Sequence, residues 1–376
     1  MKILIGADFV PTEKNIEYFQ KGNIDYLLGD ELVNLLSKAD FRIFNLETPL
    51  TDKLNPIKKY GPHLNAPTAA ISGYKAADVN LLTLANNHIF DHGIDGLNST
   101  VDVLNKSNIA YLGAGNNSSE ASKPYVFEIE NKKIGVYACA EHEFSIATPT
   151  KAGANPFDAL EAFDHVSALK EKTDYLIVLY HGGKEHYRYP SPNLQAVCRK
   201  FVDKGADLVV CQHSHCIGCE EKYNDGTIVY GQGNFLFDAA NNEYWNSGLL
   251  IEVDGCGQVS YIPITKKAET VRLAIGEDRD RILQSFYNRS EEIKDNAFVQ
   301  SKYNEYASGM LEAYLINISK VRNNIFFRVI NKLTGYRFAT FYAKRYALKM
   351  GLTLENYLDC EAHRELFLCG LRQINQ

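Results

Sequence analysis

Short apolar runs recur along the chain, and five of them are each followed directly by polar side chains. The runs cover residues 2–7, 41–44, 79–84, 175–180 and 207–211. Apolar segments of this length, bounded by polar or turn-forming residues, are typical of buried β-strands. Stretches of helical character follow the first three runs, at 24–37, 66–76 and 93–106. This alternation predicts βαβ units and a largely parallel sheet.

Two expected β-hairpins change the pattern later in the chain. Residues 123–140 contain two strand-like runs with a turn at Asn131-Lys132, and residues 248–264 repeat the arrangement with Asp254-Gly255 at the turn. A further strand is expected over 227–237. Parallel strands followed by antiparallel pairs predict two sheets that pack face to face, with helices on their outer sides.

The strand signals fade near Glu277, so we expect two domains, 1–275 and 276–376. The second is a helical appendage in which residues 313–354 contain no Asp or Glu. A basic, aromatic helix can bind an anionic membrane surface or an anionic polymer. The alternative is a helical cap whose rings pack on the sheet and whose charges are solvated. The basic residues are Lys320, Arg322, Arg328, Lys332, Arg337, Lys344, Arg345 and Lys349.

Composition excludes several classes of protein. A formal net charge of −6 over 376 residues gives no global attraction to nucleic acid, which is therefore not an expected partner. No apolar run reaches the ~18–20 residues of a membrane-spanning helix, and the N-terminus lacks a signal h-region. Cys139, Cys198 and Cys211 lie within apolar segments, so we expect reduced thiols. These features predict a cytoplasmic protein.

The polar side chains that follow the five runs are carboxylates, amides and imidazoles, all of which can ligate a divalent metal. In an open α/β sheet, ligands bind outside the carboxyl ends of the strands, so groups distant in sequence converge there. Carboxylate, amide and imidazole ligands together suit Mn, Fe or Zn better than Ca or Mg. We expect one or two ions, and a pair about 3.5–4 Å apart would favour hydrolysis. The groups are Asp8, Asn45, Glu47, Asn86, Asn87, His88, His181, His213 and His215.

Two local patterns have competing interpretations. His213 and His215 face the same side if their backbone is extended, whereas a structural zinc site with Cys216 and Cys219 is a rival interpretation. Asn86 and Asn87 follow an apolar run and would be costly to bury without partners. They either line a site or form a turn that caps the next helix.

Six motifs in order resemble the calcineurin-like metallophosphoesterase superfamily, and within it the poly-γ-glutamate capsule-synthesis CapA type. The resemblance spans roughly residues 1–265. The motifs are Gly6-Ala7-Asp8, Asn45-Leu46-Glu47-Thr48-Pro49, Asn86-Asn87-His88 with Asp91, Gly93 and Gly96, His181-Gly182-Gly183 with Glu185, Gly205-Ala206-Asp207 leading to His213-Ser214-His215, and Tyr230-Gly231-Gln232-Gly233-Asn234-Phe235.

The resemblance implies a four-layer α/β/β/α sandwich and a role for each motif. Asp8 and Glu47 would bridge or bind the metals, Asp8 would also take part in catalysis, and His88 would be the general acid for the leaving group. Asn86, which stands where typical phosphoesterases have glycine, would contact metal or substrate. The remaining metal ligands would be Asn87, His181, His213 and His215.

The first motif departs from the phosphoesterase pattern, in which the aspartate is followed by a second residue and then a histidine. Here Phe9 and Val10 follow Asp8. The chain therefore holds one ion weakly, recruits His63 or His92, or works with a single metal.

Further residues near the motifs are candidates for contact with substrate. Glu185 and Arg188 follow His181 and would form a substrate wall, with Arg188 binding a carboxylate or phosphate in bidentate fashion. Glu143 follows the strand that ends near residue 140, and Asn234 belongs to the last motif. The alternative for Glu185, Arg188 and Glu143 is a solvated polar surface.

The sequence thus predicts a metal-dependent hydrolase of the CapA type. Its expected substrate is a phosphate ester or an amide or ester bond in a capsule or cell-envelope polymer, such as poly-γ-glutamate or a polysaccharide, or in its precursor. The alternatives are a non-catalytic assembly factor for the capsule polymer, with a vestigial metal site, and a phosphatase of small metabolites.

Overall fold

The structure is a computed structural model that describes residues 1–237, 242–318, 325–335, 337–360, 362–364, 367, 368 and 371. Its centre is a seven-stranded sheet in the order β15-β14-β13-β1-β2-β3-β4. Strands β1 to β4 are parallel to one another. On the other side of β1 the pairs β1–β13, β13–β14 and β14–β15 are antiparallel. The bounds are β1 Lys2–Asp8, β2 Phe41–Asn45, β3 Leu81–Thr83, β4 Ala110–Leu112, β13 Ser247–Asp254, β14 Val259–Lys267 and β15 Thr270–Leu273.

A second sheet of six strands has the order β11-β12-β10-β9-β7-β6. Its four central strands are parallel, and its two edge strands pair in antiparallel fashion. Residues on its strands alternate between its two faces, as the pleat requires. Ile177 and Leu179 face the first sheet, whereas Leu176 and Val178 join a separate core on the other side. The bounds are β6 Tyr125–Ile129, β7 Lys132–Ala140, β9 Tyr175–His181, β10 Leu208–Gln212, β11 Glu220–Tyr223 and β12 Gly226–Val229.

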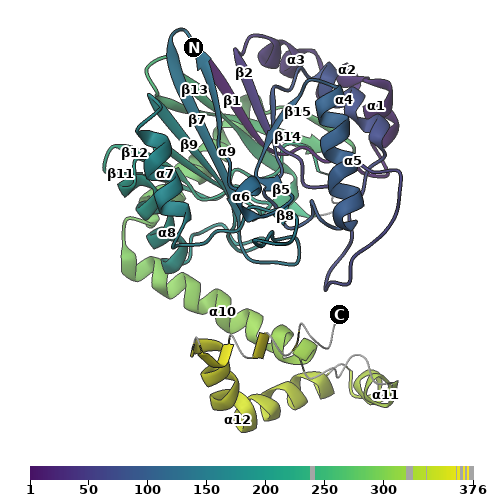
Figure 1. Cartoon of the computed structure of the whole chain (residues 1–376). Coiled ribbons are helices and arrows are strands. Elements are labelled where there is room, and N and C mark those ends of the chain that lie inside the picture. Colours follow the sequence, from purple (N-terminus) through teal and green to yellow (C-terminus); the bar gives the residue numbers. More distant parts are fainter. Residues whose placement is uncertain are drawn as a thin grey trace. The chain divides into compact units, whose positions relative to one another are not determined.

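Helices cover the outer side of each sheet, which gives the four-layer α/β/β/α sandwich that was expected (Figure 1). Helices α7 and α8 pack on the second sheet through Val166 and Phe201. The hydrophobic core that holds the two sheets together also includes residues of the helices between β1 and β4, among them Phe19 and Leu104. The bounds are α1 Ile16–Lys21, α2 Ile24–Leu28, α3 Asp30–Ser37, α4 Ile71–Ala76, α5 Gly93–Lys106, α6 Ser118–Ala121, α7 Ala162–Lys170 and α8 Pro192–Asp203.

Several expected elements differ in detail from those observed. The helix expected at 24–37 is broken by Gly29, whose φ of 74° lies in the left-handed region. The strand expected over 227–237 ends at Val229. The following residues form a loop with three isolated bridges, Ile217 to Gln232, Gly233 to Gly248 and Phe9 to Leu236. The minor elements are η1 Thr68–Ala70, η2 Glu243–Trp245, and the paired strands β5 Ala114–Gly115 and β8 Gly153–Ala154.

The chain divides into two compact units, 1–300 and 301–376, rather than at the expected boundary between residues 275 and 276. Helix α9 belongs to the first unit because it packs on strands of both sheets, β11 and β14. The ring of Phe286 lies 4.6 Å from that of Tyr261, and Ser290 Oγ accepts a hydrogen bond from Glu220 N. The remaining bounds are α9 Gly276–Glu292, α10 Asn296–Ile318, α11 Ile325–Leu333 and α12 Arg337–Asp359.

The residue that follows β1 fixes the end of that strand in an aromatic cluster. Phe9 is fully buried, and its ring centroid lies 5.0–5.4 Å from those of Phe19, Phe44, Tyr74 and Phe235. The backbone N–H of Phe9 donates to Asn45 O. The cluster therefore ties the end of β1 to β2, to helices α1 and α4, and to the loop after β12.

We predict that Phe9→Ala lowers the free energy of unfolding by about 3–5 kcal/mol, because truncation leaves a cavity among four rings. Leu160→Ala is the matched control, since Leu160 is 85% exposed and its truncation should change stability by less than about 0.5 kcal/mol. Urea unfolding followed by far-UV circular dichroism measures both. Equal stabilities would contradict the structural role of this cluster.

Candidate metal centre

The carboxyl ends of strands from both sheets meet at one site. In the first sheet Asp8 is paired with Asn45, and Asn45 with Thr83. In the second sheet His181 is paired with Gln212, the residue before His213. Asn45 Nδ2 lies 3.5 Å from His181 Nδ1, so the two sheets touch at this edge. The strand-end groups therefore converge, as the order of strands and helices requires.

Three side chains surround a single nitrogen of His181. Its Nε2 lies 3.3 Å from Glu47 Oε1, 3.1 Å from Asn87 Oδ1 and 3.1 Å from His213 Nδ1. Two nitrogens and two acceptor oxygens at such distances cannot all be satisfied by one imidazole proton. A shared cation satisfies this donor set, since each of the four atoms has a lone pair to offer.

Glu47 gives the clearest test of whether these residues suit a metal. Its carboxylate is fully buried, and among the described residues neither oxygen accepts a hydrogen bond. Ligand atoms of Glu47, His213 and His215 also lie within 4.8 Å of one another. A buried carboxylate without donors is costly unless a cation neutralises it. The residues present therefore fit a divalent metal, as the sequence predicts.

The other end of the cluster is an ion pair. Asp8 Oδ1 accepts a hydrogen bond of 2.6 Å from Asn45 Nδ2, and Asp8 Oδ2 lies 3.3 Å from His215 Nδ1. Although burial acts to raise it, His215 holds the pKa of Asp8 below its usual range. Burial lowers the pKa of His215, but Glu47 and Asp8 together raise it to about 9. His215 Nδ1 also lies 2.8 Å from Asn234 Oδ1.

His213 has the opposite electrostatic character. Burial, together with the neighbouring imidazoles of His181 and His215, holds the pKa of His213 well below its usual range. A neutral imidazole is the form that ligates a metal. The structure thus keeps this ring available as a ligand at neutral pH.

The backbone that carries the two histidines is not extended, contrary to expectation. Strand β10 ends at Gln212, and both His213 (φ 110°) and His215 (φ 53°) lie in the left-handed region. Such conformations cost about 1–3 kcal/mol each and persist only where the surroundings impose them. Arg289 of α9 helps to fix this loop, because its guanidinium donates to Gly218 O and Ile217 O.

His88 is paired with Asp91, which belongs to the same sequence motif. His88 Nδ1 lies 2.7 Å from Asp91 Oδ2, and Asp91 is fully buried. Lys59 forms an ion pair with Asp91 and lies 3.3 Å from His88 Nδ1. Although burial acts to raise it, His88 and Lys59 hold the pKa of Asp91 below its usual range. The spacing from His88 to Asp91 was a signal for this pair, whereas nothing in the sequence indicated Lys59.

Asn86 has a structural role, and its geometry does not support the predicted contact with metal or substrate. Its side-chain amide donates to Asn45 Oδ1 and Leu46 O, and its oxygen accepts from the N–H groups of His88 and Ile89. All of these groups are satisfied within a turn that presents Asn87 and His88. Asn86 is therefore a turn residue, which was one of the two interpretations of this pair. Asn87 is not, because its side-chain oxygen faces His181.

The predicted substrate-binding residues lie at different distances from the centre. Glu143 Oε1 is 3.8 Å from His213 Nε2, and burial raises the pKa of Glu143. Asn234 contacts His215 directly. Arg188 instead donates to Ile217 O, with its guanidinium 4.8 Å from the ring centroid of Tyr244, and Glu185 is exposed. Only Glu143 and Asn234 of these four are seen to contact the histidine cluster.

The structure adds an aromatic wall that the sequence analysis missed. The ring of Trp245 lies 4.6 Å from that of His215, and Trp245 Nε1 donates to His186 Nε2 at 2.7 Å. Phe237 also packs edge-on against both His215 and Trp245. No periodic pattern marks these residues, because they come from loops and a short 3₁₀ helix.

Other candidates from the sequence lie outside the centre. His63 Nε2 contacts Ile57 O, and His92 Nδ1 accepts from Asn55 N, so neither replaces the missing histidine of the first motif. Cys216 and Cys219 are buried free thiols, and in the described part of the chain the only metal-type cluster is that of Glu47, His213 and His215. The zinc interpretation of these cysteines is therefore not supported.

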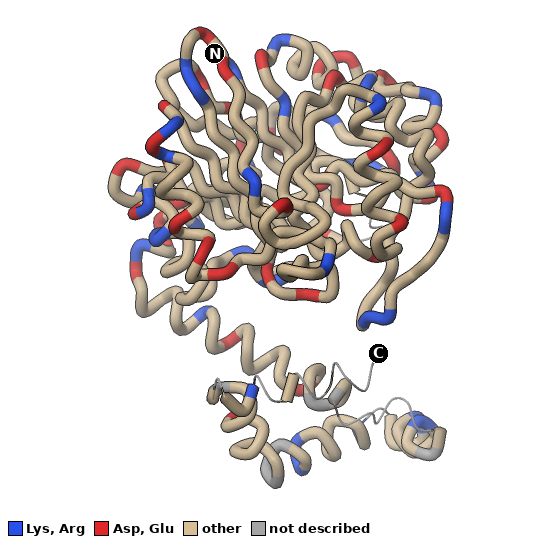
Figure 2. The backbone as a smooth tube through the Cα atoms, in the orientation of Figure 1, with Lys and Arg blue, Asp and Glu red and all other residues tan. Residues whose placement is uncertain are grey.

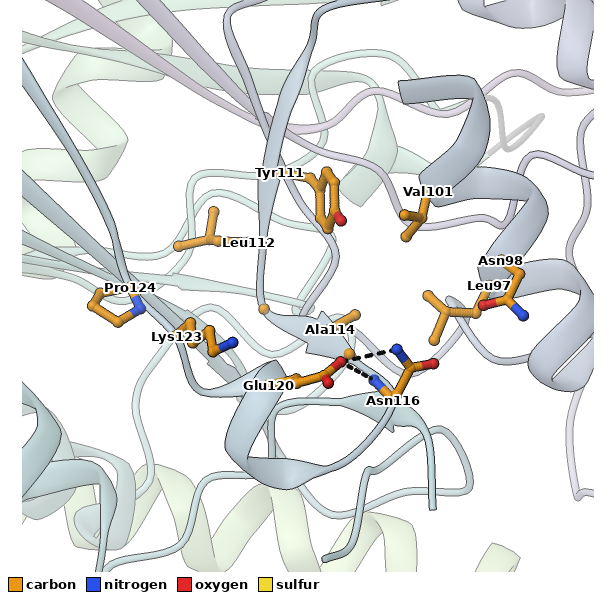
Figure 3. A pocket seen from close by; sticks show the side chains of 12 residues that line it. Leu97, Asn98, Val101, Tyr111, Leu112, Ala114, Asn116, Glu120, Lys123 and Pro124 are labelled. Carbon is orange, nitrogen blue, oxygen red and sulfur yellow. Dashed lines mark hydrogen bonds between the residues drawn. The ribbon is translucent and has the colours of Figure 1, made fainter. Parts of the chain in front are cut away.

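A separate cavity of about 280 Å³ lies beside β4 and β5 (Figure 3). Its only charged lining residues are Glu120 and Lys123. Glu120 accepts hydrogen bonds from the backbone and side chain of Asn116. None of the predicted site residues lines this cavity.

Comparison with known proteins gives one family match. The profile of the family described as "Bacterial capsule synthesis protein PGA_cap" matches residues 2–239. The capsule biosynthesis protein CapA of Bacillus anthracis is 30% identical over 224 residues, which are 57% of this chain and 54% of that protein. The PGA biosynthesis protein CapA of Bacillus subtilis (strain 168) is 28% identical over 234 residues, 60% and 61% of the two chains. The matches thus span little more than half of these relatives.

Among solved structures, that of a novel phosphatase from Mycoplasma pneumoniae is similar with a TM-score of 0.43 and 18% identity. The alignment covers 71% of this chain and 94% of that one.

We predict that Glu47→Gln removes most of the stability that the parent gains when it binds metal. In a chelator the variant should melt at the same temperature as the parent or higher, because a neutral amide removes an unpaired buried charge. With Mn²⁺ at about 100 times its Kd the parent should gain about 2.7 kcal/mol of stability, and the variant should gain little. Glu171→Gln is the control, since Glu171 is exposed at the end of α7, away from the cluster. Thermal unfolding with and without Mn²⁺ measures this, and an equal gain in Glu47→Gln would exclude Glu47 as a ligand.

Proposed function

Because the chain belongs to the bacterial capsule synthesis protein PGA_cap family, we propose that it is a metal-dependent hydrolase of a capsule or cell-envelope polymer or its precursor. The bond cleaved is a phosphate ester or an amide or ester bond. The curated relatives are named for capsule and PGA biosynthesis, which supports a polymer substrate over a small metabolite.

The observation that carries this proposal is the buried carboxylate of Glu47 within a cluster of imidazoles. Glu47 has no donor for either oxygen among the described residues, and His181 and His213 adjoin it. An inert core would place apolar side chains at such a position, since an unpaired charge destabilises the fold. A vestigial site would face the same cost without a ligand to offset it.

The residues that would hold the metal are Glu47, Asn87, His181 and His213, with Asp8 and His215 adjoining. When bound, the metal supplies a Lewis acid that polarises the substrate and activates a water. Glu143 lies beside His213 and Asn234 lies beside His215, and both would orient the substrate.

His88 has the geometry of a general acid. Its Nδ1 faces Asp91 Oδ2 at 2.7 Å, so Asp91 fixes the proton on Nδ1 and Nε2 is left to carry the transferable proton. His88 is 12% exposed at its side chain, whereas Asp91 is fully buried. A proton on Nε2 can therefore reach a leaving-group oxygen or nitrogen, while Asp91 and Lys59 stay behind the ring.

We predict that His88→Ala lowers kcat by about 10²–10⁴ for substrates with a poor leaving group, because proton transfer to that group is lost. The loss should be much smaller for p-nitrophenyl phosphate, whose leaving group departs without a proton. Phosphate release from an alkyl phosphate and amine release from a γ-glutamyl amide would be measured alongside it. The metal content of the variant, determined by elemental analysis, should equal that of the parent.

Asp91→Asn serves as the companion variant, since it keeps the shape of the side chain but alters the proton on His88 Nδ1. It should also lose activity on the poor leaving groups more than on p-nitrophenyl phosphate. An unchanged rate of His88→Ala on every substrate would remove the acid role. A parent that binds metal but turns over none of these substrates would favour an assembly factor.

A second role is supported by the C-terminal unit, taken by itself. We propose that it contacts an anionic membrane surface. No helix among the described residues is long and apolar enough to cross a bilayer. Helix α11, however, exposes Ile325, Val329 and Leu333 by 71%, 55% and 81%. These positions follow one another every fourth residue and so share one helix face.

Basic side chains flank this apolar stripe. Arg328 and Lys332 are exposed on α11, and Lys and Arg residues are drawn in blue along the unit in Figure 2. Helix α12 repeats the combination, with exposed Phe341 beside Arg337, Lys344 and Arg345. The opposite side of α11 is occupied, because Phe327 packs against Phe338 and Tyr342. Lys320 and Arg322, which the sequence analysis included in this region, lie outside the described residues.

The apolar stripe favours a lipid surface over an anionic polymer as the partner. A helix that lies in a bilayer interface buries apolar side chains among the acyl chains and holds its cations at the headgroups. A polymer such as poly-γ-glutamate offers carboxylates but no apolar layer for Ile325, Val329 and Leu333. The combination on α11 therefore matches an anionic lipid headgroup region.

We predict that the triple variant Ile325→Ser, Val329→Ser, Leu333→Ser binds vesicles of phosphatidylglycerol and phosphatidylcholine at least about tenfold more weakly than the parent, because each apolar side chain contributes to burial in the interface. The double variant Arg328→Gln, Lys332→Gln should lose a similar factor, at about 1 kcal/mol per cation. Co-sedimentation measures binding, and circular dichroism checks helicity. If only the charge variant weakens binding and poly-γ-glutamate competes, the partner is the polymer.

A further inference from the structure

A long loop over residues 52–65 lies against the turn between β3 and α5. Much of this loop is exposed, including Leu54 at 66% and Tyr60 at 77%. By contrast, only 4% of the side chain of Lys59 is exposed. Lysine is almost never buried unless it is paired with an opposite charge. The inward side chain of Lys59 therefore points to a specific partner.

That partner is Asp91, which contacts the loop at three points. The backbone N–H of Ile57 donates to Asp91 O at 3.0 Å, and that of Leu64 donates to Asp91 Oδ2 at 2.7 Å. Between these two residues, Lys59 Nζ forms an ion pair with Asp91 Oδ1. Oδ2 also faces His88 Nδ1 at 2.7 Å. The loop thus supplies a donor to each oxygen of a fully buried carboxylate.

We propose that Lys59 is a positioning residue, which holds Asp91 in the orientation that directs His88 toward the leaving group. The inference rests on the proposed function of His88 as the general acid and deepens it. Because Lys59 pairs with Oδ1, the other oxygen is left to face His88 Nδ1. Without the lysine, the buried carboxylate of Asp91 would lack its cationic partner and would be drawn toward other donors or water. His88 would then lose the contact that orients its ring.

A role in holding the loop alone would give a different result. Lys59 Nζ lies 3.3 Å from His88 Nδ1, so the ammonium is at the acid pair itself and not only at the base of the loop. If Lys59 only held the loop in place, its loss would slow all substrates to the same extent. A positioning residue affects only those substrates whose leaving group needs a proton.

The first measurement compares substrates with Lys59→Met, which keeps the length of the side chain and removes its charge. On an alkyl phosphate kcat should fall about 10–100-fold, because a misplacement of about 1 Å can cost about 10²-fold. KM should stay within about twofold, since the interaction acts in the transition state. The rate on p-nitrophenyl phosphate should be nearly unchanged. Lys59→Arg should restore most of the loss, and Lys53→Met, at an exposed lysine of the same loop, should behave as the parent.

The second measurement needs no turnover. The proton between His88 Nδ1 and Asp91 Oδ2 should give a downfield signal in the proton NMR spectrum of the full-length parent, because hydrogen bonds to a carboxylate are short and strong. Its absence from His88→Gln assigns the signal. Lys59→Met should lose or shift it, whereas Lys59→Arg and Lys53→Met should keep it.

Each outcome decides a separate point. An unchanged signal in Lys59→Met, or an equal loss of rate on both phosphates, would overturn the positioning role. A parent without the signal would remove the pair on which the proposal stands. A parent that hydrolyses none of the substrates would overturn the proposed hydrolase, whereas a signal that depends on Lys59 would still support the positioning of His88.

The parent decides the matter if Lys59→Met does not fold. Hydrogen exchange would then be followed at the amides of Ile57 and Leu64, both of which donate to Asp91. Slow exchange at both amides would support the proposal. Exchange at the rate of an open loop would overturn it, because the loop would not hold Asp91.

Discussion

The constraint on which the structure depends is the burial of negative charge where two sheets meet. Asp8 and Glu47 both lie at the carboxyl ends of strands or just beyond them, and neither is exposed by more than 1%. Carboxylates in such a place must be matched by positive charge or by donors. The surrounding imidazoles and amides are the groups that this requirement selects. The side chains that form the centre are therefore also the ones that neutralise its buried charge and so stabilise the fold.

The positions of the metal-type groups could be predicted because each follows an apolar run long enough to be recognised as a strand. Their convergence followed from the parallel order of the strands, and helix α5 was found over the expected residues. The division of the fold into sheets and helices depends on the same hydrophobic periodicity. Patterns that repeat along the chain therefore carried most of the successful inference.

The parts that could not be predicted lack any such repeat. Lys59, for example, lies in an irregular loop. The left-handed backbone of His213 and His215 was also not predicted, and it lies in a loop whose later residues accept hydrogen bonds from the distant Arg289. Asn86 appeared to be a ligand because its use as a turn residue depends on Asn45, forty-one positions away.

Half of the groups of the centre come from each sheet, so the centre forms only when the two sheets are correctly placed against each other. Helix α9 contacts both sheets, and its Arg289 holds the loop that carries the histidines. A slip of one sheet against the other by the width of a single atom would separate Glu47 from His181. Helix α9 thus helps to hold the two sheets in place relative to each other. The geometry of the histidine cluster therefore depends on a helix that lies outside it, because a displacement of α9 would remove the hydrogen bonds that Arg289 gives to the loop after His215.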